Sequence, residues 1–150
     1  MVALHIPVTD YTISTDKNML NMKWVIDELM AAPWGHWLTP EKIVESIAFE
    51  ACTCFGIYRS IGDELDQIGF ARVISDCCTF SSIMDVVIEE QYRKQGLGTA
   101  LLTEVCASPQ VKDTICIIGT SGAVLPASAA RFYKKFGFHG ADGVMTRDPT

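Results

Sequence analysis

Apolar residues recur along this chain with two different periods, one typical of β-strands and one typical of α-helices, and strand-like and helical segments follow one another along the sequence. Strand-like segments, in which apolar or β-branched residues alternate with polar ones or form short runs, are Val8–Ser14, Cys52–Ile57, Gln67–Ser75, Phe80–Ile88, Thr114–Ile118 and the residues around Val144 and Met145. Helical segments, in which apolar residues recur every three or four positions, follow Asp16 and Thr39 and occupy Gly96–Ala107 and Ala127–Phe136. The predicted order is therefore β-α-α-β-β-β-α-β-α-β.

Local signals predict where the helices begin and end. Asp16 is expected to cap the first helix, whose apolar residues recur from Met22 to Met30. Thr39-Pro40-Glu41 combines a capping hydroxyl, a proline where no amide donor is needed and a carboxylate in the first turn, so a second helix is expected to begin there. Gly137 is expected to close the last helix.

The connections between the strands predict a mixed sheet. Ser60–Asp66 is polar and contains a glycine, so the strands on either side of it are expected to form an antiparallel hairpin. The helix at 96–107 lies between the strands at 80–88 and 114–118, as a crossover between parallel neighbours requires. Because no repeat, low-complexity tract or linker divides the 150 residues, we expect an α/β fold in a single domain, 1–150.

Composition and charge narrow the range of functions. Apolar types make up 49% of the residues, which is typical of a folded globular protein. Twelve basic against eighteen acidic residues give a net charge of −6; this argues against nucleic-acid binding, which requires a basic face, and is compatible with a cationic or amine substrate. No stretch is long and apolar enough to span a membrane, and no basic residue precedes Lys17. We therefore expect neither a membrane partner nor a secretory signal.

The six cysteines are expected to be free, buried thiols. Cys52-Thr-Cys54 and the adjacent Cys77-Cys78 lack the wider gaps of structural zinc sites, and no pair of histidines is nearby. Because the chain shows no export signal and has enough apolar residues to fold without disulfides, we expect a reducing, cytoplasmic compartment and no metal. A cysteine-nucleophile enzyme is the least favoured alternative, since no Cys–His motif is evident.

The segment from Val86 to Leu102 carries the most specific chemical signal. A buried strand passes through a short charged loop into Gly96-Leu-Gly98 and then directly into an amphipathic helix. Glycines here let a ligand approach the backbone, and the free amides of the helix start attract an anion such as phosphate; Arg93 and Lys94 add positive charge. A Walker loop would need a Lys-Ser/Thr pair, and a Rossmann fingerprint would need a third glycine or alanine and an acidic residue on the next strand. The sequence supplies neither.

Two motifs together resemble the signatures of the GNAT superfamily of acyl-CoA-dependent N-acetyltransferases. Arg93-Lys-Gln-Gly96-Leu-Gly98 matches the Q/R-x-x-G-x-G/A loop, and Phe132-Tyr133-Lys-Lys-Phe-Gly137-Phe138 resembles a second signature, an aromatic pair followed by Gly-Phe. The resemblance implies a GNAT-like mixed central sheet flanked by helices and splayed between the fourth and fifth strands. It also implies acetyl-CoA as co-substrate, a primary amine as acceptor, and pairing as a homodimer, as in many members. Pro126 departs from the asparagine that many members carry there.

The resemblance further implies roles for individual residues. The pyrophosphate of acetyl-CoA is expected on the amides of 95–99, and its pantetheine arm along the strand at 86–88. Tyr133 is expected to act as the general acid that donates a proton to the departing thiolate. The residues that the resemblance assigns to acetyl-CoA are Val87, Ile88, Arg93, Lys94, Gln95, Gly96, Leu97, Gly98 and Thr99.

Several groups are candidates for the base that takes the proton from the amine. Asp85 is the first choice, because family members often carry a carboxylate on or near this strand. Strand alternation places Asp85 and Val87 on one face and Val86 on the other. The alternatives are Glu89, Glu90, His36, His139 or no protein base at all.

The acceptor stays open between small-molecule and peptide amines. The two early helices, the loop with Trp34 and Trp37, and Gly119–Pro126 are the least family-like parts and are expected to select it. The tryptophans are interpreted either as cation–π walls of an amine pocket or as core residues. The alternative from another class is a non-catalytic acyl-CoA sensor or interaction module, against which the glycine loop and Tyr133 argue.

Overall fold

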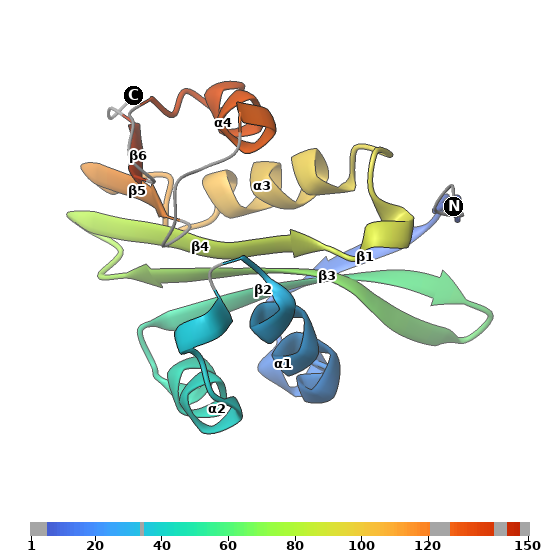
Figure 1. Cartoon of the computed structure of the whole chain (residues 1–150). Helices are drawn as coiled ribbons and strands as arrows, with labels where there is room; N and C mark the ends of the chain where they lie inside the picture. The colour runs from blue at the N-terminus through green and yellow to red at the C-terminus, as the bar shows by residue number, and fades with distance from the viewer. Residues whose placement is uncertain (1–5, 34, 121–126, 140–143, 148–150) are drawn as a thin grey trace.

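A mixed β-sheet forms the centre of the computed structural model, which describes residues 6–33, 35–120, 127–139 and 144–147 (Figure 1). Within these residues the sheet has six strands in the sequential order β1 to β6. All neighbours are antiparallel except β4 and β5, which are parallel. The strands are β1 (Tyr11–Ser14), β2 (Cys52–Ile61), β3 (Glu64–Ser75), β4 (Phe80–Ile88), β5 (Cys116–Thr120) and β6 (Val144–Arg147).

Helices cover both faces of the sheet. The helices α1 (Met22–Ala31) and α2 (Pro40–Ala48) lie on one face, and α3 (Leu97–Ala107) and α4 (Ala127–Lys134) lie on the other (Figure 1). Short 3₁₀ turns occupy Lys17–Met19, Gly35–Trp37 and Glu90–Tyr92. Among the residues described, no helix is long and apolar enough to cross a membrane.

Each face has its own apolar core, because the helices bury their apolar stripes against alternate residues of the strands. Under α3 the fully buried side chains include Leu101 and Val105, which pack with Val73 and Ile83 of the sheet. Under α1 and α2 the core residues are Val25, Leu29, Ile43, Ile47, Cys52, Cys54 and Phe70. The α/β class and the element order predicted from the sequence are confirmed.

The boundaries differ from the predictions in a few places. The hairpin turn is shorter than expected, because β2 and β3 extend to Ile61 and Glu64 and leave only Gly62, with φ +58°, and Asp63 between them. Asp16 caps the turn at Lys17–Met19, whereas Asn21 caps α1 by accepting a hydrogen bond from the amide of Trp24 at 3.1 Å. The predicted cap at Thr39 is confirmed, since its hydroxyl accepts from the amide of Lys42 at 3.2 Å.

Strands β4 and β5 pair over only part of their length. The register runs from Phe80 opposite Cys116 to Met84 opposite Thr120. Beyond Met84, β4 continues to Ile88 while β5 has ended, so the last residues of β4 have a strand partner on the β3 side alone within the described part of the chain. The predicted splay between the fourth and fifth strands is therefore present.

A β-bulge lies where the two strands part. Asp85 has φ +56°, and the register of β3 on β4 shifts between Phe70 and Arg72. Because the bulge inserts an extra residue, it changes which side chains face each layer of helices. Arg72 Nη2 pairs with Asp85 Oδ2 at 2.8 Å, with both side chains largely buried, and Nη1 contacts Ser46 Oγ on α2. The ion pair thus connects the bulge to the α2 layer.

The prediction that the cysteines are buried holds only in part. Cys52 and Cys54 are buried and form no disulfide, and Cys106 is half-buried and forms no disulfide. The prediction is wrong for Cys77 and Cys78, which are free and exposed. They lie in the turn before β4, where the Asp76 carboxylate accepts hydrogen bonds from the amides of 78, 79 and 80, so the turn is held by polar contacts on the surface.

Replacing Arg72 by Met should lower the free energy of unfolding by about 3–5 kcal/mol, because the buried Asp85 carboxylate loses its guanidinium. Chemical denaturation of R72M, D85N and the double variant measures this. We expect the double variant to be less destabilised than the sum of the single ones, since no unpaired charge is then buried. Additive losses would contradict the assigned ion pair.

Candidate functional site

A cavity of about 580 Å³ opens where β4 ends and α3 begins, and we call it the α3 cavity. It is bounded by the edge of β4, the loop that follows it, the start of α3 and one side of α4. The lining residues are Val86, Ile88, Tyr92, Arg93, Lys94, Gly96, Leu97, Gly98, Thr99, Phe132, Tyr133 and Lys135. Backbone amides, cationic side chains and aromatic rings thus meet in one place.

The start of α3 has the features of an anion site. Gly96 is the N-cap with φ +81°, a conformation that favours glycine, and it makes no side-chain cap. The first helical hydrogen bond runs from the Ala100 amide to the Gly96 carbonyl at 3.0 Å, so the amides of 97–99 have no acceptor within the helix. These amides and the positive end of the helix dipole attract an anion. Arg93, Lys94 and Lys135 supply further positive charge around the cavity.

Tyr133 brings a phenol to the same cavity. Its half-buried ring packs edge-on against Phe132 at 5.4 Å and Phe138 at 5.8 Å between ring centroids. Burial, together with the negative charge of Asp85 and the Cys106 thiol, raises the pKa of Tyr133 well above its usual value. The hydroxyl therefore stays protonated at neutral pH and can donate a proton.

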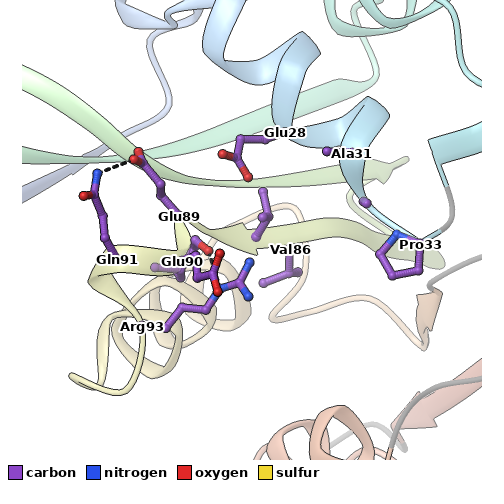
Figure 2. A pocket seen from close by; sticks show the side chains of 11 residues that line it. Glu28, Ala31, Pro33, Val86, Glu89, Glu90, Gln91 and Arg93 are labelled. Carbon is purple, nitrogen blue, oxygen red and sulfur yellow. Dashed lines mark hydrogen bonds between the residues drawn. The ribbon is translucent and has the colours of Figure 1, made fainter. Parts of the chain in front are cut away.

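A second cavity, of about 910 Å³, lies on the other side of β4, and we call it the α1 cavity (Figure 2). Glu28 reaches it from α1, Pro33 lies at its rim, and Glu89 and Glu90 follow the end of β4. The two cavities share Val86, Ile88 and Arg93. They therefore meet along the strand edge that β5 leaves unpaired.

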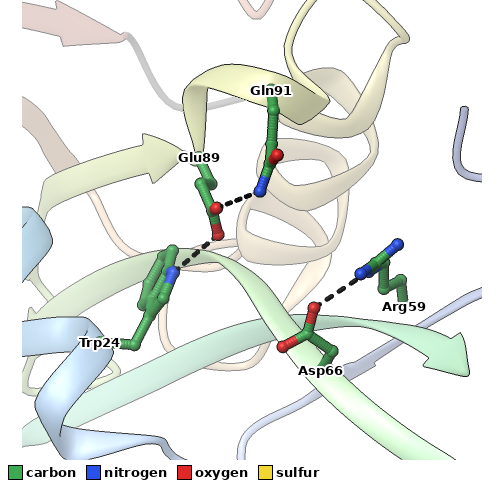
Figure 3. A network of polar contacts seen from close by, with 5 residues as sticks. All are labelled: Trp24, Arg59, Asp66, Glu89 and Gln91. Carbon is green, nitrogen blue, oxygen red and sulfur yellow. Dashed lines mark hydrogen bonds and ion pairs between the residues drawn. The ribbon is translucent and has the colours of Figure 1, made fainter. Parts of the chain in front are cut away.

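Glu89 is held by donors from two elements (Figure 3). Its Oε2 accepts a hydrogen bond from Trp24 Nε1 of α1 at 2.9 Å, and its Oε1 accepts one from Gln91 Nε2. On the neighbouring strands, Arg59 Nε pairs with Asp66 Oδ2 at 3.0 Å. The carboxylate of Glu89 thus has a fixed orientation at the end of β4.

The comparison with protein families identifies this arrangement. Residues 50–140 match the sequence model described as an acetyltransferase (GNAT) domain. This segment contains the glycine loop, α3 and the Tyr133 helix. The chain belongs to the GNAT family.

Individual relatives agree with the family assignment. The chain is 35% identical over 71 residues to the uncharacterized N-acetyltransferase ycf52 of Gracilaria tenuistipitata var. liui, covering 47% of this chain and 37% of that protein. The fold is similar to that of a GNAT-family protein from Xanthomonas campestris pv. campestris, with a TM-score of 0.72, 24% identity and 89% and 87% of the two chains covered. It is also similar to PaiA N-acetyltransferase from Thermoplasma acidophilum, solved with coenzyme A, with a TM-score of 0.64, 16% identity and 93% and 99% covered. The chain spans between 28% and 60% of the length of the curated relatives it matches.

The structure of this GNAT domain brings most of the predicted acetyl-CoA residues to the α3 cavity, with two exceptions. Val87 points to the opposite face, where it packs under α1 and lines the α1 cavity. The Gln95 side chain binds the N-terminal segment: its Oε1 accepts from the Val8 amide at 2.8 Å, and its Nε2 donates to the Ile6 carbonyl at 2.7 Å. Sequence reasoning missed Tyr92, Phe132 and Lys135 as lining residues; the motif around Tyr133 was the available signal for the last two.

The candidate bases lie in different surroundings. Asp85 lines neither cavity and is ion-paired with Arg72. Glu89 and Glu90 line the α1 cavity, whereas His36 and His139 are exposed and line neither. Among the described residues no group of three metal-ligating side chains is found.

The regions expected to select the acceptor are only partly described. Trp37 is 79% exposed, so it is not a core residue, and it lines neither cavity. Trp34 and the stretch 121–126 lie outside the described residues. The described wall of the α1 cavity is instead formed by α1, residues 32–33 that follow it, and the end of β4.

Replacing Gln95 by Ala should speed hydrogen exchange of the Val8 amide roughly fivefold, because a hydrogen bond contributing about 1 kcal/mol is lost. Coenzyme A affinity should not change, since this side chain does not line the α3 cavity. Exchange measured by NMR checks the first expectation, and calorimetry checks the second. The matched control is Gln110→Ala, which should leave Val8 unaffected; a weaker affinity for coenzyme A in Q95A would show that the side chain contacts the ligand.

Proposed function

We propose that this GNAT domain transfers an acetyl group from acetyl-CoA to a primary amine by direct attack. One observation carries the proposal: the α3 cavity places an uncapped helix start and a protonated phenol on the same strand edge. The names of the relatives, which are acetyltransferases, support the same reaction class.

The residues of the α3 cavity fit acetyl-CoA. The amides of 97–99, with Arg93 and Lys94 beside them, suit a diphosphate. The edge of β4 beyond Met84 offers backbone groups that β5 does not use, and an arm with its own amides can bond to them. A Cβ at Gly98 would be in ordinary van der Waals contact with the Phe132 ring at 3.5 Å, so the glycine leaves room for about one methyl group between the start of α3 and this ring.

Acetyl-CoA would supply the activated thioester, and Tyr133 would supply the proton for its leaving group. As the amine nitrogen bonds to the carbonyl carbon and the carbon–sulfur bond breaks, the Tyr133 hydroxyl donates its proton to the departing sulfur. The nitrogen, cationic once it has bonded, releases a proton to solvent to give the amide, and the Tyr133 phenolate takes a proton back from solvent. A phenol with a raised pKa remains protonated over the whole neutral range, so this acid is ready in every turnover.

The amine must lose a proton before it attacks, and Asp85 remains a predicted acceptor of that proton. Asp85 is ion-paired with Arg72 at 2.8 Å and lines neither cavity, so its carboxylate is not directed at an amine bound in either one. Asp85 also sets the bulge where β4 leaves β5. We therefore propose positioning as its main contribution.

Two broader proposals accompany the reaction. The absence of a disulfide at Cys52, Cys54, Cys77, Cys78 and Cys106 supports a reducing, cytoplasmic location. Pairing as a homodimer rests on the family resemblance alone.

Replacing Tyr133 by Phe should lower kcat for acetyl transfer about 100-fold or more, because the general acid is lost while the ring is kept. Release of free thiol from acetyl-CoA with a panel of primary amines measures kcat, and calorimetry should show unchanged coenzyme A affinity. In the wild type, the alkaline decline of kcat should lie above about pH 10, the usual phenol pKa.

The matched control is Tyr58→Phe, since the buried Tyr58 hydroxyl has no hydrogen-bond partner among the described residues and Tyr58 lines neither cavity. Equal activity of Y133F and wild type would remove the acid role. Coenzyme A binding without turnover of any amine would favour the non-catalytic binding module.

Replacing Gly96 by Ala should weaken coenzyme A binding about tenfold, because the strained φ displaces the helix-start amides. Gly62→Ala is the control: Gly62 also has a positive φ and open space around it, but it lies in the β2–β3 turn. Both variants should lose about 1–2 kcal/mol of stability. Equal coenzyme A affinity in the two would place the nucleotide elsewhere.

A further inference from the structure

The α1 cavity is placed to deliver a second substrate to the β4 edge. It shares Val86, Ile88 and Arg93 with the α3 cavity, so a molecule bound there reaches the strand along which the thioester is proposed to lie. Its remaining walls come from α1, from residues 32–33 that follow α1, and from residues 89–91 after β4 (Figure 2). At about 910 Å³ it has room for an acceptor longer than a single amine group.

Negative charge is in excess in this cavity. Three carboxylates, those of Glu28, Glu89 and Glu90, face one guanidinium, that of Arg93. Arg93 already donates from Nε to the Ile88 carbonyl at 2.7 Å. In the described part of the chain, none of the three carboxylates forms an ion pair within 4.0 Å.

The carboxylates differ in how they are held. Glu89 is oriented by the donors Trp24 and Gln91, which carry no positive charge. The carboxylate of Glu28 accepts no hydrogen bond from the residues that the structure describes, although the residue is half-buried. Burial, and then the charge of Glu89, raises the pKa of Glu28 above its ordinary value. A cation bound between Glu28 and Glu89 would remove this unfavourable interaction.

The attacking nitrogen of the acceptor differs from the group that the carboxylates of this cavity would bind. The reacting nitrogen must be uncharged when it attacks, so it cannot remain the cation that these carboxylates attract. A persistent positive charge has to be on another group of the same molecule. An acceptor with two basic groups satisfies both conditions.

We propose that the α1 cavity selects an acceptor amine that carries a second cationic group, with Glu28 and Glu89 binding that group. This inference rests on the proposed acetyl transfer and names its substrate class. Glu28 is a specificity residue, and Trp24 acts through Glu89 as a positioning residue.

Two acceptors of equal length test the proposal: 1,4-diaminobutane, and 4-amino-1-butanol, in which a hydroxyl replaces the second ammonium. We expect the wild type to favour the diamine in kcat/KM roughly ten- to hundredfold, as for hydrogen bonds to charged groups. Glu28→Gln should abolish most of this preference by lowering the diamine value alone. Glu45→Gln, an exposed position on α2, is the matched control and should behave as the wild type.

A second variant, a third acceptor and a binding measurement separate loss of the cation site from loss of activity in general. In Glu89→Gln the side-chain oxygen can still accept the hydrogen bond from Trp24, but the negative charge is lost, so the preference for the diamine should also fall. Unchanged coenzyme A affinity shows that each variant is folded. A lysine-rich peptide as a third acceptor distinguishes a peptide cation from a free diamine, and Glu28 dependence with either one supports the proposal. Calorimetry of 1,4-diaminobutane with the coenzyme A complex measures binding without turnover.

Equal kcat/KM for the two small acceptors, with no peptide preference, would overturn the proposal while leaving acetyl transfer intact. Loss of activity in E28Q that is equal for both acceptors would also overturn it. Absence of turnover with every amine would instead contradict the proposed acetyl transfer. In that case calorimetry tests the cation site, and equal affinity of wild type and E28Q for 1,4-diaminobutane would overturn the proposal that Glu28 binds the second cationic group.

Discussion

Strand β4 leaves β5 after the pair Met84–Thr120, and in the part of the chain that the structure describes its last residues pair with β3 alone. Unpaired backbone groups in the interior are costly, so such an edge is stable where a loop, solvent or a ligand can satisfy it. Here both cavities open along this edge. The parting of the two parallel strands thus opens the edge at which the two cavities meet, and the proposed reaction depends on this geometry.

The bulge at Asp85 lies where β4 leaves β5, and buried apolar side chains of β4 lie on both sides of it. With the extra residue, Ile83 and Ile88 both face the α3 side, while Val87 faces α1. A non-glycine residue at φ +56° carries some strain, and the buried ion pair with Arg72 compensates for it. Because Arg72 also contacts Ser46, the position of α2 is coupled to the shape of the strand edge.

The charges on the two sides of β4 have opposite signs. On the α3 side, helix-start amides and Lys94 and Lys135 suit an anion, and on the α1 side the glutamates suit a cation. In the proposed reaction, the strand separates the diphosphate of the co-substrate from the ammonium of the acceptor, and their reactive ends meet at its edge. Arg93, which lines both cavities, stands at the boundary. An acidic protein can therefore bind an anionic co-substrate, because the local field matters more than the net charge.

The sequence alone determined the elements and the glycine loop, because periodicity, caps and turn residues act over a few positions. The prediction for Phe80–Ile88 has the bounds of β4, and Thr39 caps α2 as expected. Tertiary structure alone decided which distant residues meet. Trp24 and Glu89 are 65 positions apart, and the Gln95 side chain bonds to Val8 rather than to the cavity. Such contacts depend on how helices and strands pack across a twisted sheet with a bulge, and no short-range pattern encodes that packing.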